Sequence, residues 1–111
     1  MNFKDGVIFD GVRQEIWYAL GVCQCAFLML VNKPFIVTSL KDGHHGPTSL
    51  HPSGKAADIR TRHLNEVQIE HVYLFLKRQL SALGFDVVLE SEHIHIEYDP
   101  QSNEKFISWV A

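Results

Sequence analysis

Apolar residues recur along the chain with two different periods, and these periods predict two helices and several short strands. Apolar side chains three and four residues apart predict helices over residues 10–31 and 65–83. Short β-branched or alternating apolar runs predict strands at residues 34–40, 56–61, 85–90 and 93–98. We therefore expect a single α+β domain over residues 1–111, with two helices packed on a small, mainly antiparallel sheet. The apolar tail, residues 106–110, is expected to pack onto the core.

The first predicted helix is apolar enough to raise the question of a membrane segment. Between residues 16 and 31 the only polar side chain is Gln24. That run is shorter than the ~20 residues that a membrane-spanning helix requires. Asp5, Asp10 and Glu15 precede it, whereas a signal peptide begins with a positive region. We expect a buried core helix, no membrane partner and no export signal, and hence synthesis in the cytoplasm.

Composition narrows the choice of partners. The net charge of −3 gives no basis for binding a nucleic acid. Cys23 and Cys25 are two residues apart on the predicted helix, where side chains do not face each other, so neither a disulfide nor a structural zinc site is expected. We expect a monomer. Histidine is the unusual residue, with seven in 111.

A long loop and a distant strand carry the residues with metal-binding chemistry. Residues 41–55 are rich in Gly, His, Pro and Ser and predict a long loop, which in a compact domain is usually functional. Zinc in hydrolytic sites commonly takes three imidazole or carboxylate ligands and one water. Gly54 allows the chain to turn back so that His51 and Asp58 reach one ion, and His95 can add a third ligand from its strand.

Two motifs around these residues resemble a known family. Residues 49–58 fit the pattern S-x-H-x-x-G-x-A-x-D at every fixed position, and residues 93–95 fit H-x-H. Together they resemble the zinc peptidases of the D-alanyl-D-alanine carboxypeptidase family, whose fold is shared with the hedgehog signalling domain. Within that family the chain is similar to the small phage-type L-alanyl-D-glutamate endopeptidases. The resemblance covers residues 36–100 and implies a hedgehog-like α+β fold with bound zinc.

The resemblance also implies roles for individual residues. It makes His51, Asp58 and His95 the zinc ligands. The carboxylate that acts as acid and base in the family lies three residues before the last ligand, which is Glu92 here. His93 would help to stabilise the oxyanion of the reacting carbonyl, and Ser49 would brace the loop or contact the substrate.

One position departs from the family. Many relatives carry Ser-Gly-Tyr-Arg before the motif, whereas residues 38–41 here are Thr-Ser-Leu-Lys. Lys41 can replace the arginine as a point charge in substrate binding, but it lacks the bidentate fork of a guanidinium group. Lys55, Arg60 and Arg62 are interpreted as a solvated face that can also attract the carboxylates of a stem peptide.

The assignments on the last strand have alternatives. Glu90 lies three residues before His93, and Glu97 shares a strand face with His95, so both compete with Glu92 as the base. His93 is an alternative metal ligand.

The implied function is that of a zinc metallopeptidase that hydrolyses an amide bond in the stem peptides of bacterial peptidoglycan. The bond would be L-Ala–D-Glu, as in an endopeptidase, or D-Ala–D-Ala, as in a carboxypeptidase. The chain would then be a phage or prophage lysis enzyme that reaches the cell wall through a holin or from the virion. The alternative is a zinc-stabilised binding or virion module of the same fold without catalysis. A carboxylate at Glu92 favours the enzyme, and the lost arginine favours the binding module.

Overall fold

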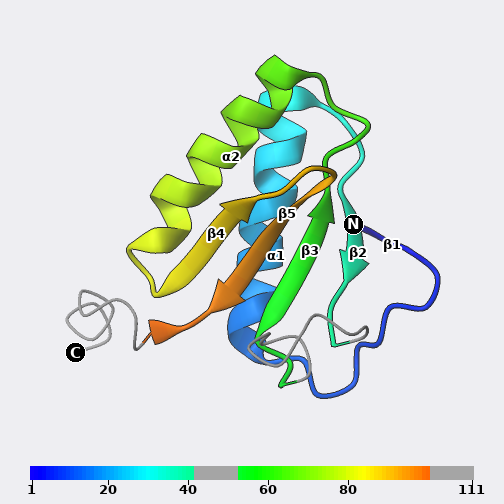
Figure 1. The fold of residues 1–111 in the computed structure, drawn as a ribbon, viewed down its shortest axis with the longest axis vertical. Helices are drawn as coiled ribbons and strands as arrows, with labels where there is room; N and C mark the ends of the chain where they lie inside the picture. The colour runs from blue at the N-terminus through cyan, green and yellow to red at the C-terminus, as the bar shows by residue number, and fades with distance from the viewer. Residues whose placement is uncertain (42–52, 101–111) are drawn as a thin grey trace.

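The chain folds into two helices packed against a five-stranded mixed sheet, which confirms the predicted α+β class (Figure 1). The computed structural model describes residues 1–41 and 53–100. The predicted packing of residues 106–110 lies outside that range. In chain order the elements are β1 (Asn2–Phe3), α1 (Gln14–Ala26), the π-helical turn η1 (Phe27–Val31), β2 (Ile36–Ser39), β3 (Ala56–Arg60), α2 (Glu66–Ser81), β4 (Phe85–Leu89) and β5 (His93–Tyr98).

The sheet has the strand order β1-β2-β3-β5-β4. The β2–β3, β3–β5 and β5–β4 pairs are antiparallel, and β1 pairs with β2 in parallel, so the sheet is mainly antiparallel as predicted. In Figure 1, α1 runs behind the sheet, and α2 lies beside α1 and β4. The β1 strand was not predicted, because two residues are too few to show an alternating pattern.

The first helix is the predicted one, but it begins at Gln14 rather than at residue 10. The preceding residues turn, and the backbone N–H of Arg13 donates to the carbonyl of Gly54 at 2.9 Å. The helix continues as η1 and stops at Asn32, which adopts a left-handed conformation with φ of 50°. One side is buried against the core, as the three- and four-residue spacing predicts. The other side is exposed at Trp17, Leu28 and Met29, so the helix is only half-buried and not the buried helix expected from the sequence. By length and composition alone, the stretch from Gln14 to Val31 is sufficient to cross a membrane.

The second helix is framed by the predicted start and stop signals. Asn65 accepts a hydrogen bond from the backbone of Gln68, and Gln68 accepts one in return from the backbone of Asn65, which forms a capping box. Val72, Leu76 and Leu80 form the buried stripe predicted for this helix. The helix therefore covers the sheet beside α1 and packs against β4.

The two central strands have one apolar face buried under the helices. Ile59 of β3 and Ile94 and Ile96 of β5 are fully buried in the core. Because side chains alternate along a strand, the residues between them project from the opposite face of the sheet. This second face carries the polar residues of the candidate site.

Candidate metal centre

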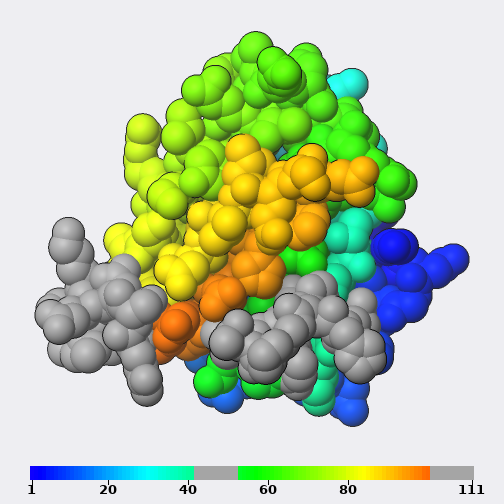
Figure 2. All heavy atoms as spheres, in the orientation of Figure 1, coloured from blue at the N-terminus to red at the C-terminus, as the bar shows by residue number. Residues whose placement is uncertain are grey.

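Asp58 and His95 lie directly opposite each other on neighbouring strands. The antiparallel register of β3 and β5 pairs their Cα atoms. Both side chains leave the face of the sheet that points away from α1, and this face is turned toward the viewer in Figure 2, where β4 and β5 reach the surface. Two of the three ligands predicted from the sequence are thus neighbours, although 37 residues separate them along the chain.

His95 is held between two carboxylates. Its Nδ1 lies 2.8 Å from Oδ1 of Asp58, and its Nε2 lies 2.7 Å from Oε1 of Glu97. The hydrogen bond to Asp58 is the largest cause that raises the pKa of His95 from 6.5 to about 9, and burial of the ring opposes the rise. With both ring nitrogens donating, the metal-free protein holds an imidazolium ion at this position near neutral pH.

His93 lies on the same face and approaches two carboxylates of its own. Its Nε2 is 3.6 Å from Oδ1 of Asp58 and 3.3 Å from Oε1 of Glu90. One potential ligand atom from each of Asp58, Glu90 and His93 lies within 4.8 Å of the others. A four-coordinate zinc ion with bonds of ~2.0–2.2 Å separates its ligand atoms by roughly 3.3–3.6 Å. These residues therefore have the donor types and the spacing to hold a metal ion.

Asp58 belongs to both possible ligand sets. Its side chain is 6% exposed and touches the imidazoles of both His93 and His95. For Asp58 and His95 to bind one ion together, their contact atoms must separate by roughly 0.5 Å beyond hydrogen-bond distance, and the shared proton must leave. The pair of Asp58 and His93 already has the wider spacing.

Of the other site residues predicted from the sequence, two lie outside the described residues and one is exposed in a turn. His51 and Ser49 lie outside the described residues, so the predicted third ligand and the predicted brace are not placed. Glu92 is exposed in the turn between β4 and β5, where its backbone carbonyl accepts from Thr61 at 3.0 Å. Within residues 1–41 and 53–100, its carboxylate makes no hydrogen bond or ion pair, whereas that of Glu90 contacts His93.

Lys41, which the sequence predicts to take part in substrate binding, lies against the N-terminal segment. Its side chain lies over Gly11, so closely that a Cβ added there would overlap Nζ. Its backbone N–H donates to the carbonyl of Ile8 at 3.3 Å. The ammonium group is therefore packed against the N-terminal segment.

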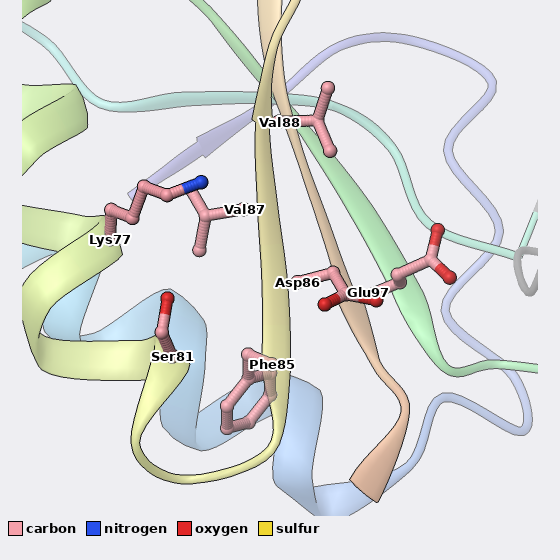
Figure 3. A pocket seen from close by; sticks show the side chains of 7 residues that line it. All are labelled: Lys77, Ser81, Phe85, Asp86, Val87, Val88 and Glu97. Atoms are coloured by element: carbon pink, nitrogen blue, oxygen red, sulfur yellow. The ribbon is translucent and has the colours of Figure 1, made fainter. Parts of the chain in front are cut away.

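A second acidic group adjoins the site and was not predicted from the sequence. Carboxylate oxygens of Asp86, Glu97 and Asp99 lie within 4.8 Å of one another. Figure 3 shows Asp86 and Glu97 on one side of β4, with Lys77 and Ser81 of α2 on the other, around a pocket of about 340 Å³. The antiparallel register places Asp86 opposite Glu97. The alternation of side chains along β4 and β5 could have predicted that these two carboxylates share a face of the sheet. Because Glu97 also binds His95, this group adds negative charge beside the candidate metal site.

Comparison with known proteins adds no family assignment. No family model matches the chain. No curated protein matches it either.

Proposed function

We propose that the chain is a zinc-dependent metallopeptidase that hydrolyses an amide bond in peptidoglycan stem peptides. The observation that carries this proposal is the nearly buried carboxylate of Asp58 between the imidazoles of His93 and His95. With His51, one of these two imidazoles and the Asp58 carboxylate would form the set of two histidines and one carboxylate that zinc uses in hydrolytic sites, with the fourth position left for water. The motif around Asp58 resembles that of peptidases acting on these substrates, which supplies the substrate class.

Two ligand sets contain Asp58, and both take His51 as a further ligand. In the first, His95 binds with Asp58 and His51, and Glu92 is the carboxylate three residues before the last ligand. In the second, His93 takes the place of His95, and Glu90, which lies three residues before it, is the base beside the metal rather than a ligand. The contact of 3.3 Å between Glu90 and His93 supports the second set.

The chemistry needs a metal, a base and a donor to the oxyanion. When bound, zinc lowers the pKa of a water molecule to about 7 and polarises the scissile carbonyl. Glu90 or Glu92 takes the proton of the attacking water and returns it to the leaving amine. The histidine that does not bind the metal donates a hydrogen bond to the oxyanion as charge develops there. The base and the oxyanion donor would thus come from one face of β5 or from the turn that precedes it.

Digestion of purified peptidoglycan by the zinc-loaded chain tests this proposal. Mass spectrometry separates the two bonds, because D-Ala–D-Ala cleavage releases free D-alanine and L-Ala–D-Glu cleavage releases the peptide from the glycan. We expect the wild type to cleave one of them, and Glu90→Gln or Glu92→Gln to abolish cleavage while zinc stays bound. Glu70→Gln is the matched control, because Glu70 is an exposed glutamate on α2. Intact stem peptides after incubation with zinc-loaded wild type contradict a peptidase.

A zinc-stabilised binding or virion module is the second candidate. It is favoured by Lys41, which stands where relatives carry an arginine and packs over Gly11. In that case the zinc-loaded chain would sediment with intact peptidoglycan, or with virion components, without changing any fragment mass. A phage or prophage lysis enzyme, by contrast, would reach the wall through a holin or from the virion and cleave it.

A further inference from the structure

The outward side of α1 and η1 is mostly apolar, and Gln24 is an exposed polar side chain within it. Trp17, Tyr18, Leu28 and Met29 are 38%, 54%, 67% and 79% exposed, respectively. Phe9 is 46% exposed and stacks on Trp17 with ring centroids 6.3 Å apart, which extends the surface at one end. No charged residue occurs between positions 15 and 33. Exposed apolar surfaces of this kind on a folded domain mark sites of association.

Two small residues, Gly21 and Cys25, also lie in the middle of this surface. Gly21 lies inside α1 and is exposed, and a Cβ built on it meets no atom within 4 Å. Glycine is a poor helix former, and no contact within the described residues requires it at this position. A glycine on a helix surface does allow a second helix to approach closely. Cys25, one turn further on, is also small and exposed.

We propose that this surface is the dimer interface between two copies of the chain, with the two α1–η1 helices packed antiparallel. Tyr18, Gly21, Cys25 and Leu28 follow one another at steps of three, four and three residues, which is the spacing of a helix-packing seam. A two-fold axis level with Cys23 places Gly21 against Cys25 of the second copy. The same axis places Tyr18 against Leu28 of the second copy. Large residues then flank a close central contact on both sides.

The size of the surface suits a weak dimer. If a fully exposed large side chain contributes roughly 200 Å², the four exposed fractions of Trp17, Tyr18, Leu28 and Met29 add about 1,000 Å² over two copies. That is near the lower limit of about 1,000–1,200 Å² for specific association. We therefore expect a dimer that dissociates on dilution.

Charge favours a second copy over a lipid surface. Helices that lie on membranes carry Lys and Arg beside their apolar face to contact anionic headgroups. The stretch between Glu15 and Lys33 has none, and the net charge of the chain is −3. The two-fold axis brings Lys33 of one copy level with the Arg13–Glu15 ion pair of the other, so charged residues lie only at the two ends of the interface. The inference does not depend on zinc or on catalysis, and it departs from the monomer expected from the sequence.

Sedimentation equilibrium of the full chain, from low micromolar to several hundred micromolar, tests the proposal. Leu28→Glu and Gly21→Leu should each weaken association at least tenfold, which corresponds to ~1.4 kcal/mol. Leu74→Glu, which changes a leucine 48% exposed on α2, is the matched control and should leave association unchanged. Circular dichroism shows whether each variant keeps its helices.

Two results would overturn the proposal. One is a wild-type chain that stays monomeric throughout the concentration range, whether or not it binds phospholipid vesicles in a separate assay. The other is a dimer of unchanged affinity in folded Leu28→Glu and Gly21→Leu, because the interface would then lie on another surface.

Discussion

The hydrogen bond between Asp58 and His95 predicts how the stability of the metal-free chain depends on pH. The substitution Asp58→Asn keeps the shape of the side chain and removes its charge. It therefore removes the largest cause of the raised pKa of His95, which moves from 6.5 to about 9 on folding. At ~1.4 kcal/mol per unit, that shift corresponds to about 3 kcal/mol of stability when His95 is protonated. Because the ring is only partly shielded from solvent, and because Glu97 also raises the pKa and remains in the variant, we expect about 1–2 kcal/mol for this substitution.

The sign of the dependence follows from which protonation state the fold favours. Since the pKa of His95 is raised on folding, its contribution is complete below about pH 6.5, the pKa of histidine in the unfolded chain. It is lost as the pH rises through about 9. The difference in unfolding free energy between wild type and Asp58→Asn should therefore be largest near pH 6 and smallest near pH 10.

Urea unfolding in the presence of a chelator measures this difference at each pH. Glu70→Gln on α2 is the control for a general effect of charge, and its difference from wild type should stay near zero throughout. The reasoning fails if Asp58→Asn costs the same free energy at pH 6 and pH 10. It also fails if the imidazole of wild-type His95 titrates by NMR at or below pH 6.5.

Three further predictions concern the fold: a glycine with positive φ, a helix cap and the two cysteines. Gly54→Ala should lower the unfolding free energy by about 1–2 kcal/mol, because Gly54 has a φ of 75° and an added Cβ would overlap the carbonyl oxygen of Gly11. Urea unfolding measures this loss, and an unchanged midpoint would refute the prediction. Asn65→Ala should cost about 1 kcal/mol in thermal unfolding through loss of the capping box, whereas Asn65→Asp should be nearly neutral. At low protein concentration a thiol reagent should modify Cys25 quickly and Cys23 only on unfolding, because burial raises the pKa of the Cys23 thiol; equal rates would contradict the buried position.

The fold was largely predictable because its signals are local. The three- and four-residue spacing of Ile16, Leu20, Cys23 and Phe27 defines the buried side of the first helix without knowledge of its neighbours. The start of that helix was predicted four residues too early. Its true position depends on a hydrogen bond between Arg13 and a residue 41 positions away, which no local pattern reveals.

The candidate site was predictable only in part. Alternation along β5 correctly placed His93, His95 and Glu97 on one face, since Ile94 and Ile96 identify the other.

The position of Asp58 against these residues depends on the register of β3 and β5, which is set by long-range pairing. Neither the contact of Glu90 with His93 nor the packing of Lys41 over Gly11 follows from residue spacing, because both depend on how turns and termini fold back.

Calorimetric titration of the metal-free chain with zinc is the most direct test of the central claim that Asp58 anchors a metal site. The account predicts one tight site per chain in wild type, loss of that site in Asp58→Ala, and an unchanged site in the control Glu70→Ala on α2. Of His93→Ala and His95→Ala, the variant that lowers the zinc affinity more identifies the histidine ligand. Absence of zinc binding by the wild type, or undiminished affinity in folded Asp58→Ala, would contradict the claim.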